Sequence, residues 1–84
     1  MNQASPVLVF GAMWCVDCRR SKQFLEEHGV PYKWHDVSHD PAAMALVQKI
    51  NNGMKSIPTI VFSDGSIMVE PSNRDLAKKL GVTA

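Results

Sequence analysis

Both cysteines of this chain lie at one junction, where a run of β-forming residues gives way to a helical pattern. The run Val7–Phe10 is apolar throughout and ends at Gly11, which is typical of a strand buried on both faces. Cys15 and Cys18 follow, separated by two residues, within the segment 14–20. The sequence therefore predicts two thiols at the start of a helix that comes directly after a buried strand.

A thiol in the first turn of a helix is well placed to react. The unpaired backbone N–H groups and the positive end of the helix dipole both favour thiolate over thiol. A second thiol one turn later lies on the same helix face, with the two Cβ atoms roughly 5 to 6 Å apart. We therefore expect Cys15 and Cys18 to interconvert between a dithiol and a disulfide.

Length and composition limit the class of protein. The chain has 84 residues, 45% hydrophobic and 20% charged, with a formal net charge of +1. This predicts a single domain, residues 1–84, without the basic excess of a nucleic-acid-binding protein. Residues 1–6 carry no Lys or Arg, and the first apolar run is short, so neither a signal peptide nor a membrane span is expected. We expect a cytoplasmic protein, in which catalytic, redox-sensing or metal-binding cysteines are favoured over a permanent disulfide.

The remaining pattern predicts a four-stranded mixed sheet with three helices, in the order β-α-β-α-β-β-α. Asp40 and Ser72 are expected N-caps, the latter in a capping box with Asp75, and Gly29 and Gly81 follow helix ends. We expect a parallel first strand pair, an antiparallel final hairpin and helices on both faces, which is a thioredoxin-like α/β layout. The predicted strands are 7–10, 30–37, 57–62 and 67–69, and the predicted helices are 15–27, 41–50 and 73–80.

Several motifs together resemble the glutaredoxin family over essentially the whole chain. Trp-Cys-Val-Asp-Cys (14–18) follows the first strand, and Ser-Ile-Pro-Thr (56–59) opens the third. Further likeness lies in Asn-Asn-Gly (51–53), Asp-Gly-Ser (64–66) and Pro-Ser (71–72), which look most like the bacterial mycoredoxin and glutaredoxin-like branch. The combination of two cysteines with a proline ahead of the third strand is far more specific than either feature alone.

The resemblance implies roles for these residues. By it, Cys15 is the nucleophile, Cys18 is the resolving cysteine, and the Ile57–Pro58 peptide bond is cis. Such a bond would turn the Ile57 backbone N–H and C=O toward the cysteines, where they could pair with an incoming peptide or thiol as an added strand does. The implied activity is that of a thiol-disulfide oxidoreductase that acts on mixed disulfides between proteins and a low-molecular-weight thiol.

Two positions differ from the common pattern of that family. The usual Pro-Tyr between the cysteines is replaced by Val16-Asp17, and the carboxylate of Asp17 opposes a thiolate at Cys15 while Arg19, Arg20 and Lys22 favour one. The usual Gly-Gly before the last helix is replaced by Glu-Pro (70–71), which weakens glutathione recognition. Ser72-Asn73 still offers helix N-terminal N–H groups to a carboxylate.

The predicted site comprises the two catalytic cysteines and a rim for substrate. We expect a small thiol of the mycothiol or glutathione type as reductant, with no tightly bound cofactor and no metal. The expected partners are disulfide-containing proteins. We expect the protein to be a monomer that binds neither membranes nor nucleic acids. Trp14 has a second interpretation, that of a packing residue beside the site. The candidate substrate-binding residues are Trp14, Val16, Asp17, Ser56, Ile57, Pro58, Ser72 and Asn73.

Two other functions are compatible with the cysteine pair. One is a dithiol electron donor recharged by thioredoxin reductase, similar to the small redoxins that feed ribonucleotide reductase. The other is a non-enzymatic carrier of an iron–sulfur cluster or metal, which would need ligands beyond the two thiolates of one chain.

Overall fold

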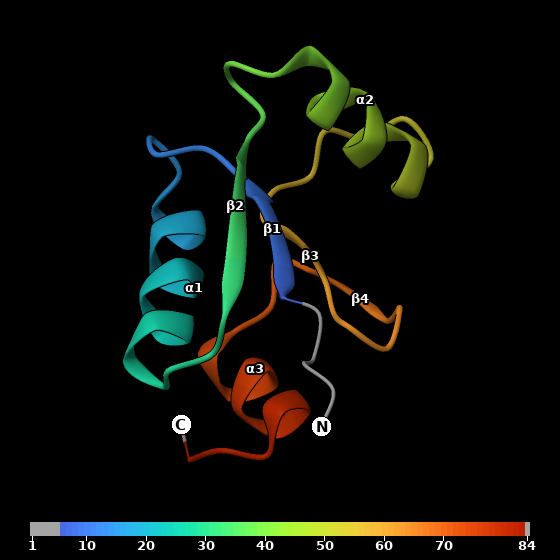
Figure 1. Ribbon diagram of the computed structural model, residues 1–84. Helices are drawn as coiled ribbons and strands as arrows, with labels where there is room; N and C mark the ends of the chain where they lie inside the picture. The colour runs from blue at the N-terminus through green and yellow to red at the C-terminus, as the bar shows by residue number, and fades with distance from the viewer. Residues whose placement is uncertain (1–5, 84) are drawn as a thin grey trace.

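The computed structural model describes residues 6–83, so residues 1–5, where no export signal is expected, and Ala84 lie outside the described part. The elements follow one another in the predicted order (Figure 1). They are β1 (Val7–Gly11), α1 (Val16–Glu27), β2 (Tyr32–Asp36), α2 (Pro41–Ile50), β3 (Thr59–Val61), β4 (Ile67–Val69) and α3 (Asn73–Leu80).

One mixed sheet, in the strand order β2-β1-β3-β4, forms the centre of the molecule. β1 runs parallel to β2, with Val9 opposite Trp34, and antiparallel to β3, with Phe10 opposite Thr59. β3 and β4 form the antiparallel hairpin. The parallel first pair and the final hairpin are therefore confirmed, and the thioredoxin-like fold follows from them.

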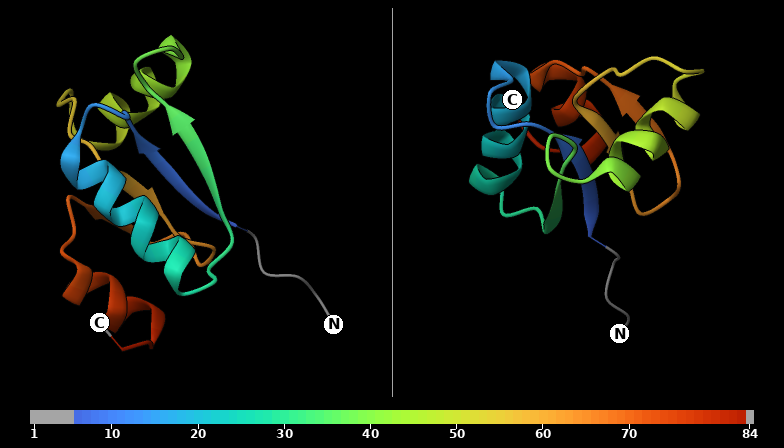
Figure 2. Two further views of the ribbon diagram at one scale, coloured as in Figure 1. Left: turned by 90° about the vertical axis from the view of Figure 1, so that its left-hand side faces the viewer. Right: turned by 90° about the horizontal axis from the view of Figure 1, so that it is seen from above.

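Helices cover both faces of this sheet, as predicted. α1 and α3 pack on one face, and α2 lies on the other (Figures 1 and 2). The larger core joins β1, β3, α1 and α3, and the smaller one lies under α2. The larger core is built from Val7, Val9, Phe24, Leu25, Ile60, Phe62, Leu76 and Ala77, and the smaller from Phe10, Val37, Ala43 and Val47.

The helix ends form at the predicted residues. The Asp40 carboxylate accepts the N–H groups of the second and third residues of α2, and Pro41 occupies the first helical position, where a missing N–H has no cost. Ser72 and Asp75 form the capping box of α3, and Gly81 ends that helix in the left-handed conformation at φ 71°. These signals are local, because each joins residues only a few positions apart in the chain.

Two of the four predicted strands were too long. The third strand covers Thr59–Val61 rather than 57–62, because Pro58 has no N–H to donate to a ladder. The second strand covers Tyr32–Asp36 rather than 30–37. The longest helix, α1, has 12 residues, and within residues 6–83 no helix is long and apolar enough to span a bilayer.

Candidate active site

Cys15 is the N-cap of α1, and its sulfur serves as the capping acceptor. Its backbone is extended, with φ −90° and ψ 116°, and its sulfur accepts a hydrogen bond from the Cys18 N–H at 3.3 Å. The Cys15 N–H donates to the Ala12 carbonyl at 3.1 Å, which folds the segment back toward the end of β1. A sulfur therefore occupies the position at which a Ser or Asp oxygen normally receives the first free N–H groups of a helix.

Cys18 is fully buried behind Cys15, whereas Cys15 is partly exposed, and both thiols are free. Burial, and in second place a hydrogen bond to Cys15, raise the pKa of the Cys18 thiol to about 12. Cys18 therefore keeps its proton at neutral pH. Of the two cysteines, only Cys15 is partly exposed, and its sulfur accepts an N–H of the first turn of α1.

Gly11 provides the space that Cys18 fills. A Cβ atom at residue 11 would lie 2.8 Å from the Cys18 sulfur and 3.0 Å from the indole of Trp34. Real Cβ atoms do not approach other atoms so closely, so no larger residue fits without displacing the thiol. Gly11 is thus a site residue that the sequence analysis treated only as a strand end.

The Ile57–Pro58 bond is cis, as the resemblance predicted. The β1–β3 register pairs Phe10 with Thr59, and its extension sets Pro58 opposite Gly11 and Ile57 opposite Ala12. The loop before β3 and the segment that leads into α1 both lie near the end of the sheet at which β1 ends (Figure 1). The structure thus brings the cis-proline corner and the two cysteines together from segments about 40 residues apart in the chain.

Large apolar side chains next to Cys15 in the chain lie on the surface. Trp14 is 72% exposed, with its indole N–H donating to the Ser38 hydroxyl at 2.9 Å, so its interpretation as a packing residue was wrong. Val16 is 66% exposed on the first turn of α1. Met13 and Met54 are also exposed, and neither was selected from sequence, because a methionine carries no local signal for surface or core. Met13, Trp14 and Val16, which flank Cys15 in the chain, give the site an apolar rim, whereas Met54 lies in the loop after α2.

Arg20 connects α1 to the start of α3. Its guanidinium donates to the Asn73 side-chain oxygen at 2.8 Å, to the Pro71 carbonyl at 3.3 Å and to the Asp17 carboxylate at 3.3 Å. The negative charge of Asp17 is therefore partly compensated beside Cys15. The Ser72 N–H donates to Asp75, so the predicted carboxylate site at α3 already has an internal acceptor.

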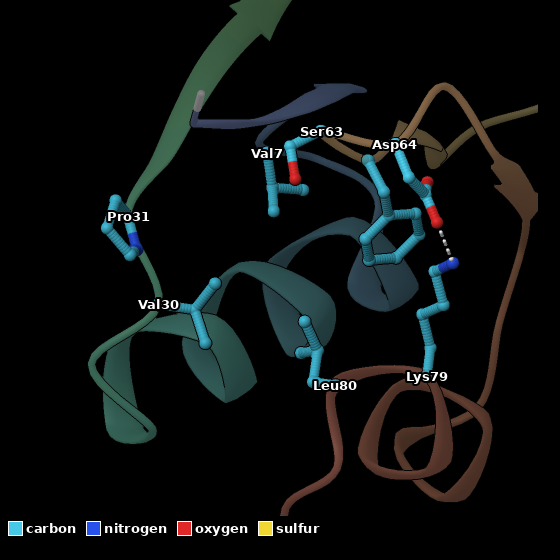
Figure 3. Close-up of a pocket in the computed structure, with 8 residues that line it drawn as sticks. Val7, Val30, Pro31, Ser63, Asp64, Lys79 and Leu80 are labelled. Carbon is cyan, nitrogen blue, oxygen red and sulfur yellow. Dashed lines mark hydrogen bonds and ion pairs between the residues drawn. The ribbon is translucent and has the colours of Figure 1, made fainter. Parts of the chain in front are cut away.

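A separate pocket of about 320 Å³ lies at the opposite end of the sheet, beside the start of β1 (Figure 3). Val7, Val30 and Leu80 contribute to its apolar lining. Asp64 and Lys79 meet at 2.7 Å on its rim and so neutralise each other. Since β1 separates this pocket from Cys15 by about 15 Å, the pocket is not part of the cysteine site.

The fold and the site define a class of protein. A dithiol on the first turn of a helix, beside a cis-proline at the edge of a mixed sheet, characterises thioredoxin-fold redox proteins. Within residues 6–83, no group of three or more His, Cys, Asp or Glu side chains is arranged to hold a metal ion.

Comparison with known proteins gives the family. A glutaredoxin family model matches residues 7–67. A Mycobacterium tuberculosis protein named as a glutaredoxin is 33% identical over 72 residues, which is 86% of each chain. Mycoredoxin 1 of Corynebacterium glutamicum is 30% identical over 80 residues, covering 95% of this chain and 99% of that protein. A variant of the thioredoxin-like protein BC3987 superposes with a TM-score of 0.81 at 26% identity, covering 94% of this chain and 99% of that chain. The chain belongs to the glutaredoxin family.

Proposed function

We propose that this protein reduces mixed disulfides between proteins and a low-molecular-weight thiol of the mycothiol or glutathione type, with Cys15 as nucleophile. The observation that carries the proposal is the contrast between the two thiols. The Cys15 sulfur is accessible and accepts a helix N–H, whereas the Cys18 sulfur is fully buried and keeps its proton. The Cys15 sulfur is thus suited to attack a disulfide, and the Cys18 sulfur is suited to act later as the resolving thiol.

The proposed reaction has two displacement steps. The Cys15 thiolate attacks the small-thiol sulfur of the mixed disulfide, forms a Cys15–small-thiol disulfide and releases the protein thiolate, which takes a proton from water. The thiolate of a second small-thiol molecule then attacks that disulfide, which regenerates the Cys15 thiolate and releases the oxidised small thiol. In sum, one mixed disulfide and one free small thiol become one protein thiol and one disulfide of the small thiol.

Cys18 offers a second way to complete the cycle. As the resolving cysteine, it would lose its proton and attack Cys15, releasing the small thiol and leaving a Cys15–Cys18 disulfide for external reduction. The raised pKa of Cys18 favours the route through a second small thiol, because only a thiolate attacks. We therefore expect a Cys18→Ser variant to keep most of its turnover when the small thiol is the reductant.

The exposed rim is the proposed contact surface for substrate. Trp14 and Val16 present apolar area beside Cys15, and the Ile57 backbone lies where an added strand would pair. The proposed rim also includes Asp17, Ser56, Ser72 and Asn73. The Pro58 side chain is fully buried, so Pro58 would act on substrate only through the backbone shape of its corner. We place the reaction in the cytoplasm, with the protein acting as a monomer.

The decisive experiment offers one fluorescent peptide as mixed disulfides with mycothiol and with glutathione. Each substrate is supplied with its own thiol and the matching reductase, and peptide release is followed for wild type, Cys15→Ser and Cys18→Ser. The proposal predicts turnover of at least one substrate by wild type and Cys18→Ser, and none by Cys15→Ser. Turnover supported only by thioredoxin reductase and NADPH would instead indicate the dithiol donor. A coloured, iron-loaded dimer without turnover would indicate a cluster carrier.

A further inference from the structure

A buried hydroxyl connects α2 to the cis-proline corner. Thr59 is 0% exposed, and its hydroxyl oxygen takes part in two hydrogen bonds. It accepts one from the Asn51 side-chain amide at 3.1 Å and donates one to the Ser56 carbonyl at 2.7 Å. The same amide group of Asn51 also donates to the Val47 carbonyl in the last turn of α2, at 2.9 Å. These three hydrogen bonds form a continuous chain from α2 through Asn51 and Thr59 to Ser56, called the relay below.

The relay fixes the orientation of the Ile57 N–H. The Ser56 carbonyl and the Ile57 N–H belong to one peptide unit, which is planar and trans, so the two groups point in opposite directions. When Thr59 holds the Ser56 oxygen, it also directs the Ile57 N–H away from Thr59. Within the described residues that N–H has no backbone acceptor, so it is available to a substrate.

We propose that Asn51 and Thr59 are positioning residues that hold the Ile57 N–H ready to bind an amide carbonyl of the substrate. This inference rests on the proposed function and makes it more specific. It predicts that the protein selects disulfides whose cysteine carries flanking amides over disulfides of equal reactivity that have none. The selectivity should depend on the relay, whereas the nucleophilicity of Cys15 should not, because the Cys15 sulfur receives its hydrogen bond from α1.

The test compares two disulfides in single-turnover reactions of the reduced protein. One is the disulfide of N-acetylcysteine methylamide, which carries amides on both sides of the cysteine. The other is bis(2-hydroxyethyl) disulfide, which carries none. The second-order rate constant for loss of the Cys15 thiol is measured for each. The selectivity is the ratio of the two constants divided by the same ratio for a free small thiolate, which removes the difference in leaving-thiol pKa. No recharging thiol is required, so the choice of reductant does not affect the result.

Thr59→Val removes the hydroxyl at similar shape, and Thr59→Ser keeps it, so the two form a matched pair. Thr59→Val should lower the rate with the amide-bearing disulfide by about tenfold, the size expected for one lost hydrogen bond, and leave the other rate unchanged. Thr59→Ser should retain the wild-type selectivity. Asn51→Ala provides an independent break in the relay, and the double variant Asn51→Ala/Thr59→Val should lose no more than the worse single variant.

The outcomes separate this inference from the proposed function. Equal losses on both disulfides, or unchanged selectivity in folded Thr59→Val and Asn51→Ala variants, would overturn the positioning role and leave the oxidoreductase activity standing. A wild-type protein whose Cys15 reacts with neither disulfide would overturn the proposed function itself. Thermal unfolding shows whether each variant is folded. If either Thr59→Val or Asn51→Ala fails to fold, the other variant decides whether the positioning role stands.

Discussion

At the scale of single residues, Cys15 combines a structural and a chemical role in one atom. Its sulfur caps α1 by accepting the Cys18 N–H, and the same sulfur is the proposed nucleophile. The Cys18 N–H, which the cap satisfies, and the dipole of α1 also favour a negative charge on the sulfur. Helix stability and thiol reactivity therefore depend on the same contact.

Substitution of Cys15 should separate these two roles. Serine is a good N-cap and alanine is a poor one. The free energy of unfolding of Cys15→Ala should therefore be about 1 kcal/mol lower than that of Cys15→Ser. Neither variant should turn over a disulfide. Urea unfolding of both proteins measures the difference, and equal stabilities would show that the residue 15 side chain contributes nothing to the cap.

Glu70 is a second residue with an unusual conformation. It adopts the left-handed region at φ 52°, where it donates its N–H to the Pro58 carbonyl at 2.8 Å. Side chains with a Cβ atom are disfavoured there, so Glu70→Gly should be about 1 kcal/mol more stable than Glu70→Ala. Both variants remove the carboxylate, so their difference in unfolding free energy reports the backbone alone. A more stable alanine variant would contradict the assigned conformation.

At the scale of elements, β1 and α1 meet through a contact that only glycine permits. The end of β1 approaches the first turn of α1 so closely that the Cys18 sulfur fills the space beside Gly11. This contact sets the depth at which the buried thiol sits. It also places the ring of Trp34, from the parallel neighbour β2, against the same point.

Gly11→Ala should therefore destabilise the protein by about 1 to 3 kcal/mol, the usual range for overpacking a core. The loss should be smaller when Cys18→Ala is introduced in the same chain, because the shorter side chain makes room for the new methyl group. A four-member double-mutant cycle in urea measures the coupling. Additive effects would mean that the strand and helix are separated more widely than described.

Elements were predictable where their signals are local. The caps of α2 and α3 involve residues two or three positions apart, such as Ser72 and Asp75, and both helices were found with correct ends. The cis bond at Pro58 was predicted from family resemblance alone. Contacts between distant segments were not predictable: Arg20 and Asn73 are 53 residues apart, and nothing in either local sequence indicates their hydrogen bond. The exposure of Trp14 was missed for the same reason, since it depends on what the fold brings beside it.

At the scale of the whole molecule, the two ends of the sheet differ, because one carries the cysteine site and the other carries an ion pair. The cysteines and the cis-proline corner lie at the end of the sheet where β1 ends, and Arg20 connects α1 to the start of α3. The ion pair of Asp64 and Lys79 lies at the opposite end, where it joins the β3–β4 turn to α3 (Figure 3). Stability at that distant end can therefore be altered without touching the thiols.

The Asp64–Lys79 pair predicts a pH dependence in the acid range. The hydrogen bond from Lys79 is the main cause that holds the pKa of Asp64 well below its usual value near 3.8. A carboxylate with a lowered folded pKa contributes stability that is full above its unfolded pKa and is lost as the pH falls toward the folded one. Asp64→Asn should thus be less stable than wild type above about pH 5, and the gap should narrow below about pH 4.

Urea unfolding of the two proteins between pH 3 and pH 7 measures that gap, and the rate of Cys15 alkylation at pH 7 should be the same in both. A gap that does not change with pH would assign the effect of the substitution to something other than the carboxylate charge.

The capping sulfur of Cys15 also bears on the direction of electron flow. Once a small thiol is attached to that sulfur, the negative charge that the first turn of α1 favours is gone. In the proposed reaction, the cap contact would therefore favour the reduced protein over the neutral Cys15–small-thiol disulfide.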